Sequence, residues 1–234
     1  MKRLLAAALA ALCLAALPGC GASKQEESAP VQEEAPAPPP EPTPEELAAQ
    51  EIDDLLASLT TEEKVGQLFF VRCPAEFAVE DVTTYHLGGY VLFGRDFADK
   101  TADAVIQTLR SYQSAAVEDT GIPLLLGVDE EGGTVVRVRS EKYSSPQKLL
   151  SAGGTEALVA DTEEKDALLS ALGINVNLAP VADVSTSSAD FMYDRTCGLD
   201  ASGTAECIRA VVEQMAHDNM GSVLKHFPGY GNNV

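Results

Sequence analysis

Short apolar segments alternate with longer amphipathic segments along most of this 234-residue chain, and this alternation limits the possible folds more than any other feature. Five apolar segments have the length of strands: 69–71, 89–93, 124–128, 176–178 and 222–224. Segments with helical spacing lie between several of them, at 101–117, 155–172 and 202–219. Such an alternation predicts an α/β fold with a parallel sheet and right-handed crossovers. The pattern alone allows either a doubly wound sheet or a (β/α)8 barrel.

Two helices are expected before the first strand. Thr43 can cap a helix that has Pro44 at its first position and Glu46 in the capping box, with apolar residues at helical spacing up to Leu59. A second short helix is expected to open at Thr60–Lys64. Globular structure should therefore begin near residue 43.

Charged and polar side chains follow the last three expected strands. Asp129 follows the third strand, Asp183 follows the fourth, and Lys225 with His226 follow the fifth. The carboxyl ends of parallel strands are where α/β barrels carry their chemistry. From the residues alone, the two carboxylates could form the acid/base pair of a glycosidase, or one of them could be a structural hydrogen-bond acceptor. Likewise, Lys225 and His226 could be no more than a surface lysine and a packed histidine.

Four motifs that stand in a fixed order resemble glycoside hydrolase family 3, especially its β-N-acetylhexosaminidase branch. They are Gly88–Arg95, Pro123–Gly133, Asn175–Val184 and Gly221–Gly231. The resemblance covers roughly Leu59 to Val234. It implies the (β/α)8 barrel rather than the doubly wound sheet. Because a complete barrel has eight strands in about 250 residues, about five of the eight βα units are expected here, and the barrel is expected to be incomplete.

The resemblance also implies a set of substrate-binding residues: Asp129, Arg137, Arg195, Lys225 and His226. Asp129 would accept hydrogen bonds from sugar hydroxyls, and the Lys-His pair would hold the sugar in the −1 subsite. By the same resemblance, Asp183 lies in a segment that mainly shapes the barrel. Charged and imidazole side chains suit this task because a pyranose presents many hydroxyl donors and acceptors.

The family resemblance implies a retaining mechanism with a covalent glycosyl-enzyme intermediate. The acid/base Asp-x-His motif and the nucleophilic aspartate are expected beyond Val234, so no catalytic residue is expected within the chain, which looks truncated after its fifth strand. An open arc of strands would leave apolar surface uncovered, and poor solubility is expected for such a polypeptide. No cofactor and no metal site are expected.

The implied activity is release of terminal GlcNAc from glycans such as cell-wall fragments. The alternatives are a β-glucosidase-type hydrolase of the same family and a non-catalytic sugar-binding lipoprotein. The sequence departs from the family pattern at several positions. Tyr230 replaces the usual His, Thr134 replaces an Arg, Asn232-Asn233 replace Asp-Thr, and Cys197 stands in the place of Phe in the Arg-x-Phe-Gly motif.

The first 42 residues predict export and tethering. Lys2 and Arg3 precede an apolar run that is too short to span a bilayer, as in a signal peptide. Cys20 ends a sequence that resembles a bacterial lipobox, so residues 1–19 are expected to be removed and Cys20 to be lipidated; an ordinary secretory signal is the alternative. Residues 20–42, rich in Pro, Glu and Ala, are predicted to be a disordered tether. The partial barrel would then be 43–234, held outside the cytoplasm on the bacterial cell membrane.

The net charge of the chain limits the classes of molecule that it can bind. The formal net charge is −20, and it becomes −22 without Lys2 and Arg3. This charge disfavours nucleic acid as a partner, and it leaves the lipid anchor as the only expected contact with a membrane.

Three cysteines remain once Cys13 and Cys20 are set aside: Cys73, Cys197 and Cys207. They have no zinc-ligand spacing and are expected to be buried free thiols, although Cys197 and Cys207 could pair in an oxidising compartment. The sequence does not determine the oligomeric state.

Overall fold

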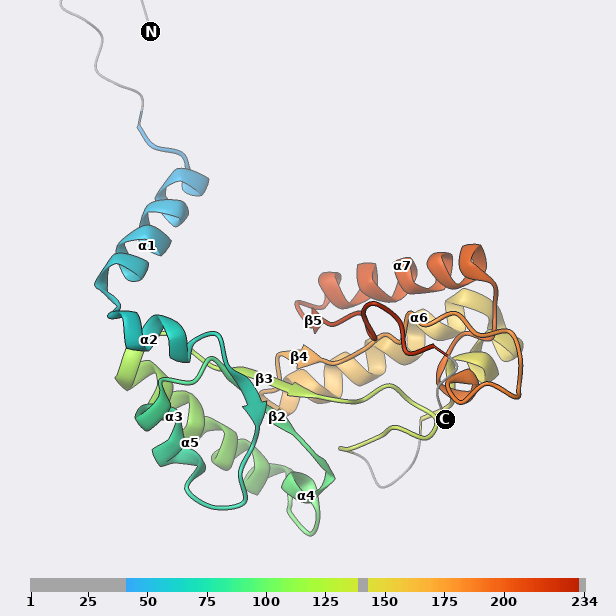
Figure 1. Cartoon of the computed structure of the whole chain (residues 1–234), viewed down its shortest axis with the longest axis horizontal. Coiled ribbons are helices and arrows are strands. Elements are labelled where there is room, and N and C mark those ends of the chain that lie inside the picture. The colour runs from blue at the N-terminus through green and yellow to red at the C-terminus, as the bar shows by residue number, and fades with distance from the viewer. Residues whose placement is uncertain (1–40, 139–142, 232–234) are drawn as a thin grey trace, which may run out of the picture. The chain divides into compact units, whose positions relative to one another are not determined.

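The computed structural model describes residues 41–138 and 143–231 (Figure 1). The strands are β1 (Phe70–Arg72), β2 (Gly89–Leu92), β3 (Leu125–Val128), β4 (Val176–Asn177) and β5 (Gly221–Ser222). The helices are α1 (Pro44–Ser58), α2 (Thr61–Gly66), α3 (Ala78–Tyr85), α4 (Gly94–Phe97), α5 (Ala102–Thr120), α6 (Pro146–Leu172), α7 (Ala201–His217) and the 3-10 helix η1 (Tyr193–Arg195). The predicted strands are all present, each within two residues of its expected position, whereas α3, α4 and η1 had no counterpart in the sequence prediction.

The five strands form one parallel sheet in the order β1-β2-β3-β4-β5. Gly89 of β2 pairs with Phe70 on one side and Leu125 on the other, and Asn177 pairs with Val128 and Ser222. Spatial order therefore follows chain order without a reversal. A doubly wound sheet would reverse its strand order at a switch point, whereas a barrel adds each strand beside the last. The prediction of an incomplete (β/α)8 barrel is confirmed.

The core lies between the strands and the helices that follow them. Its largest buried side chains include Tyr90, Leu126, Leu169 and Met215. Tyr90 packs edge-on against Tyr112 of α5 and donates its hydroxyl proton to the carbonyl oxygen of Ala78, 2.8 Å away. This packing fixes the strands relative to α5, α6 and α7, and so fixes where each strand ends.

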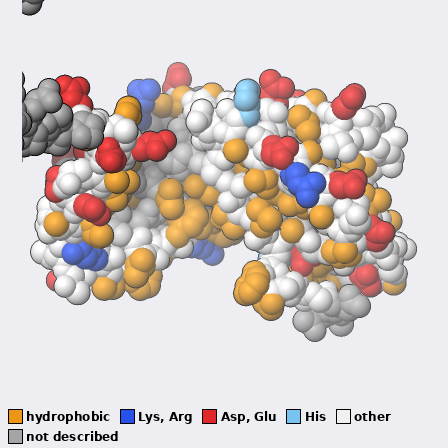
Figure 2. All heavy atoms as spheres, turned by 90° about the horizontal axis from the view of Figure 1, so that it is seen from above, with side chains coloured by type: hydrophobic (Ala, Val, Ile, Leu, Met, Phe, Trp, Pro, Cys, Tyr) orange, Lys and Arg blue, Asp and Glu red, His pale blue; other side chains and the backbone are white. Residues whose placement is uncertain are grey.

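Although segment 124–128 is almost entirely apolar, Leu125 of β3 is 50% exposed. Successive side chains of a strand point to opposite faces, and Leu126 and Val128 face the helices and are buried. On the other face the ring of Phe70 lies across Gly127, where a Cβ atom would meet a ring carbon at 2.4 Å. Hydrophobic side chains are also gathered in a hollow of the face seen in Figure 2.

Several helix boundaries follow the expected capping chemistry. The side chain of Thr60 accepts from the backbone of Glu63, and the Glu63 carboxylate accepts from the Thr60 backbone, which is the capping box that opens α2. Gly173 ends α6 at φ 90°, a left-handed backbone conformation that glycine adopts readily. However, α6 begins at Pro146, earlier than expected, because two segments are joined across a kink at Gly153 and Gly154.

Helix α1 forms where the apolar spacing predicted it, but none of its side chains is buried. Leu47, Ile52 and Leu56 are each more than half exposed within the described part of the chain. The spacing therefore predicted the secondary structure correctly without predicting a packing partner.

The three predicted thiols, Cys73, Cys197 and Cys207, are buried and free, which confirms that prediction. Burial raises the pKa of Cys73 to about 11, and burial together with the neighbouring Cys207 raises the pKa of Cys197 to about 12. Cys20, the predicted lipidation site, lies outside the described residues. Within the described ranges, no helix is both long and apolar enough to cross a bilayer.

Candidate active site

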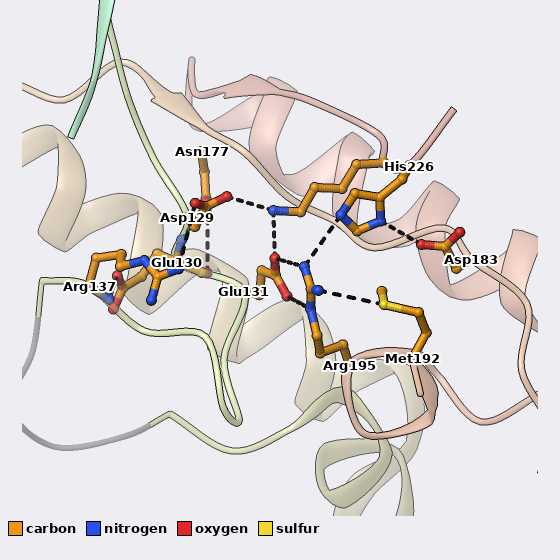
Figure 3. Close-up of polar contacts among 10 residues, drawn as sticks. Asp129, Glu130, Glu131, Arg137, Asn177, Asp183, Met192, Arg195 and His226 are labelled. Carbon is orange, nitrogen blue, oxygen red and sulfur yellow. Dashed lines mark hydrogen bonds and ion pairs between the residues drawn. The ribbon is translucent and has the colours of Figure 1, made fainter. Parts of the chain in front are cut away.

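Polar side chains from three neighbouring strand ends and one helical turn converge at one edge of the sheet (Figure 3). Asp129, Glu130 and Glu131 follow β3, Asp183 lies in the segment after β4, and Lys225 and His226 follow β5. Arg195 reaches the same place from η1. The backbone bridge between Val181 and Lys225 extends the β4–β5 pairing beyond the regular strands and brings the last two segments together.

Glu131 is the centre of this network. Its carboxylate accepts two parallel hydrogen bonds from Arg195, at 2.8 Å from Nε and 2.7 Å from Nη2. Lys225 Nζ lies 2.5 Å from Glu131 Oε1, the oxygen atom that also accepts from Arg195 Nη2. Glu131 is almost fully buried, and the two cations balance its charge. In turn, the hydrogen bond to Glu131 raises the pKa of Arg195 above its ordinary value.

Asp129 lies at the more exposed end of the same network. Lys225 Nζ donates to its Oδ1 atom at 2.6 Å, and Arg137 Nη2 lies 3.9 Å from its Oδ2 atom. Asp129 and Glu131 therefore share one lysine. A carboxylate that is held by cations and is partly open to solvent is suited to accept further hydrogen bonds from the hydroxyl groups of a ligand.

His226 is oriented by Asp183. The imidazole Nδ1 atom lies 2.7 Å from Asp183 Oδ2, while Nε2 lies 3.4 Å from Arg195 Nη2. A proton on Nδ1 satisfies the carboxylate, and Nε2 then presents its lone pair toward the arginine. The other oxygen of Asp183 accepts a hydrogen bond from the backbone N–H of Tyr230 at 2.7 Å. Asp183 was expected to lie in a segment that mainly shapes the barrel, and its side chain in addition sets the orientation of His226.

Glu130 supports the loop that carries Arg137. Its buried Oε2 atom accepts hydrogen bonds from the backbone N–H groups of Arg137, at 2.8 Å, and of Val138, at 3.0 Å. The side-chain amide of Asn177, in β4, accepts from the backbone N–H of Glu130 and donates to its carbonyl oxygen. These contacts join the end of β3 to β4, so the direction in which Asp129 leaves the strand is fixed.

Lys165, a buried cation from α6, lies beneath the network. Its Nζ atom donates to the backbone carbonyl oxygen of Glu131 at 3.2 Å and pairs with Asp161 Oδ2 at 2.7 Å. The ammonium also lies 5.6 Å from the centre of the Tyr143 ring. The helix layer therefore contacts the backbone of the β3 loop directly, which helps to fix the position of Glu131.

A cavity of about 450 Å³ opens beside these side chains. Asp183, Lys225 and His226 line one part of it, and Pro228 and Gly229 line another. Its volume lies in the range of pockets that bind small ligands, and donors and acceptors converge on it as such pockets require. In the described part of the chain, no group of three or more His, Cys, Asp and Glu side chains is placed to hold a metal ion.

The structure brings most of the predicted binding residues together. Direct contacts, or contacts through Glu131, link four of them: Asp129, Arg195, Lys225 and His226. Arg137 lies at the margin of this group, 3.9 Å from Asp129. Glu131 was missed as a site residue, although it is adjacent to the Asp-Glu motif in the sequence. Its role depends on Arg195, which is 64 positions away in the chain.

A protein family and several known proteins are similar to this chain. Residues 60–234 match the model of the glycosyl hydrolase family 3 N-terminal domain. Beta-hexosaminidase A of Pseudoalteromonas piscicida is 32% identical over 160 residues, which are 65% of this chain and 26% of that protein. Beta-hexosaminidase LpqI of Mycobacterium tuberculosis is 30% identical over 180 residues, covering 75% of this chain and 45% of that protein. The chain thus spans less than half the length of both relatives.

Solved structures show the same likeness. A family 3 β-N-acetylglucosaminidase from Paenibacillus superposes with a TM-score of 0.68 at 29% identity, over 75% of this chain and 34% of that one. The β-N-acetylhexosaminidase from Beutenbergia cavernae superposes with a TM-score of 0.67 at 32% identity, over 75% of this chain and 56% of that one. In both cases the matched region covers three quarters of this chain.

Proposed function

The chain belongs to glycosyl hydrolase family 3, and we propose that it supplies the sugar-binding half of a retaining β-N-acetylhexosaminidase that releases terminal GlcNAc from glycans. Relatives named as beta-hexosaminidases and β-N-acetylglucosaminidases support GlcNAc as the sugar. In this proposal the residues of the chain bind and orient the sugar. Cell-wall fragments are a suitable class of glycan because they contain GlcNAc.

The observation that carries the proposal is the single connected network of Asp129, Glu131, Arg195, Lys225 and His226 beside the cavity. Three consecutive contacts join Lys225 Nζ to the Nε2 atom of His226, by way of Glu131 and Arg195. A pyranose needs several hydrogen bonds from converging directions, and charged groups make the stronger ones. This arrangement matches that requirement.

The contacts also indicate what Asp129 and Asp183 do. Asp129 is held at 2.6 Å by Lys225, and both oxygens of Asp183 are engaged, one by His226 and one by the Tyr230 backbone. A general acid must donate a proton to the leaving-group oxygen, whereas in these contacts the carboxylates accept hydrogen bonds from Lys225 Nζ and from the Tyr230 backbone N–H. We therefore assign Asp129 to hydroxyl recognition and Asp183 to the orientation of His226.

Direct binding measurements test the proposal. We expect the protein to bind GlcNAc more tightly than glucose in isothermal titration calorimetry. In a protein that also includes the acid/base and nucleophile residues expected beyond Val234, we expect release of 4-nitrophenol from its GlcNAc β-glycoside rather than from its glucoside. Preference for glucose would favour the β-glucosidase alternative. GlcNAc binding without any hydrolysis would favour a non-catalytic sugar-binding protein. Absence of binding to either sugar would contradict the site assignment.

We also propose that Cys20 carries the lipid that holds the protein outside the cytoplasm on the bacterial cell membrane. The basic start, the apolar run and Cys20 itself support this proposal. With residues 20–42 as the tether, the partial barrel at 43–234 would stand away from the bilayer. We expect Cys20→Ser to move the protein from the membrane fraction to the medium, and unchanged membrane fractionation would contradict lipidation.

A further inference from the structure

Two aromatic side chains from distant parts of the chain are stacked beside the candidate site. Phe191 lies just before η1, and Tyr230 follows the Pro228-Gly229 turn. Their ring centroids are 5.4 Å apart, and their planes differ by 20°. The ring of Tyr230 also meets the imidazole of His226 edge-on at 5.3 Å. The three rings therefore form a continuous series that begins at a proposed sugar-binding residue and leads away from it.

The contacts of Asp183 and Arg195 place this pair of rings relative to the cavity. One oxygen of Asp183 binds His226, and the other binds the backbone N–H of Tyr230, so the two rings share one anchor. On the other side, Met192 follows Phe191 in the chain, is buried, and approaches Arg195 Nη1 with its sulfur atom at 3.6 Å. Residues on both sides of each ring line the 450 Å³ cavity: Asp190, Met192, Gly229 and Gly231.

Exposure distinguishes the outer ring from the inner ones. Phe191 is 56% exposed, whereas Tyr230 and His226 are intermediate. Single exposed apolar residues are common on protein surfaces and need no explanation. Phe191 differs from them because it is stacked on a second ring and because that ring touches the proposed sugar site. Aromatic rings beside a polar pocket offer a large, rigid apolar face at low cost in side-chain entropy.

We propose that Phe191 and Tyr230 form an aromatic platform that binds the sugar unit adjacent to the one held by Asp129, Lys225 and His226. The C–H groups on the face of a pyranose are its apolar part, and they can pack against an aromatic ring while its hydroxyls remain hydrated. The platform therefore favours ligands of at least two linked sugars over a monosaccharide. This inference rests on the proposed function, since it takes the polar network as the first sugar site.

The test compares two sugars on the whole protein. Affinities for GlcNAc and for its β-1,4-linked disaccharide are measured by isothermal titration calorimetry. An aromatic contact of this kind predicts that the disaccharide binds roughly 3- to 10-fold more tightly. In Phe191→Ala the ratio of the two affinities is expected to fall to about one, and in Phe191→Trp, which keeps a flat ring, the preference is expected to persist.

Phe77→Ala is the matched control. Phe77 is also an exposed phenylalanine, 66% exposed, but it precedes α3 and, among the described residues, its ring stacks on no ring of the site, whereas Phe191 stacks on Tyr230. We expect this variant to keep the wild-type ratio. If Phe191→Ala also keeps the wild-type ratio, or if the wild-type protein shows no preference while still binding GlcNAc, the platform is wrong and the proposed function stands. If neither sugar binds to the wild-type protein, both proposals fail.

Discussion

Two almost fully buried carboxyl groups in this molecule have opposite surroundings. Glu131, at the end of β3, is met by Arg195 and Lys225 at 2.5–2.8 Å. Asp166, in α6, has no hydrogen-bond partner for either carboxyl oxygen among the described residues. It faces Asp218 at the end of α7 and has Lys165 beside it, and burial is the largest cause that raises its pKa from 3.8 to about 7.

The difference shows that burial alone does not mark a functional site. A buried carboxylate that is paired on both oxygens remains a charged part of a network, whereas an unpaired one gains stability by binding a proton. Charged side chains are therefore concentrated at the strand ends next to a cavity, while the region between α6 and α7 favours the neutral form of a buried carboxyl. Perturbed titration is a frequent sign of catalysis, but here the strongly raised carboxyl lies away from the candidate site.

Glu131→Gln should have the largest effect on stability, because it removes the ion pairs that distinguish Glu131 from Asp166. The substitution keeps the volume of the side chain but removes the charge that Arg195 and Lys225 share. Breaking a buried ion pair by removing one partner costs about 3–5 kcal/mol, so the free energy of unfolding should fall by about that amount. Urea denaturation at pH 7 measures it.

A control carboxylate follows the neighbouring strand β2 of the same sheet. Asp96 accepts a hydrogen bond from the Phe93 backbone at 2.7 Å, and within the described residues its ion-pair partner is Arg95, which is not part of the network. Asp96→Asn should cost only about 1 kcal/mol. Equal losses in the two variants would mean that the Glu131 network has no special energetic weight.

Asp166→Asn should have a smaller effect on the free energy of unfolding, and this effect should depend on pH. Because the folded-state pKa of about 7 lies above the unfolded value of 3.8, the folded protein holds more protons between these values, and its stability falls as pH rises through that window. Relative to Asp166→Asn, the wild-type protein should lose about 2–3 kcal/mol between pH 5 and pH 8. Thermal or urea unfolding at several pH values measures the difference. A difference that stays constant with pH would show that Asp166 is ionised in the folded state.

Asp129→Asn tests the exposed end of the paired network and should have the smallest effect on folding. A hydrogen bond to a charged group is worth about 1.5–3 kcal/mol. In a protein that includes the catalytic residues expected beyond Val234, kcat/KM on a GlcNAc glycoside should therefore fall roughly 10- to 150-fold. The loss should be small on a substrate that lacks the contacted hydroxyl, because that substrate never made the bond.

The leaving group separates this role from acid catalysis. If Asp129 were a general acid, activated aryl glycosides would restore the rate of Asp129→Asn because they need no protonation. We expect no such restoration. Wild-type kcat/KM in the variant would remove Asp129 from the binding site altogether.

The sequence by itself determined the class of fold and the positions of its elements. Apolar strands and amphipathic helices are local patterns that depend on neighbouring residues, so the five strands and α1, α2, α5 and α7 could be placed from the chain alone. Short helices such as α4 (Gly94–Phe97) are too brief to leave a periodic pattern. The family motifs added the residues Asp129, Arg137, Arg195, Lys225 and His226, whose types suited sugar binding before any contact was known.

Only the tertiary structure decided which of those residues act together. Glu131 and Arg195 are 64 positions apart, Asp129 and Lys225 are 96 positions apart, and the orientation of His226 depends on Asp183, 43 positions before it. Such contacts arise because parallel strands in chain order bring their carboxyl ends to one edge of the sheet. The role of a side chain at this edge depends on the charged groups that contact it from other strands. A local sequence pattern cannot predict these contacts, because the partners are far apart in the chain.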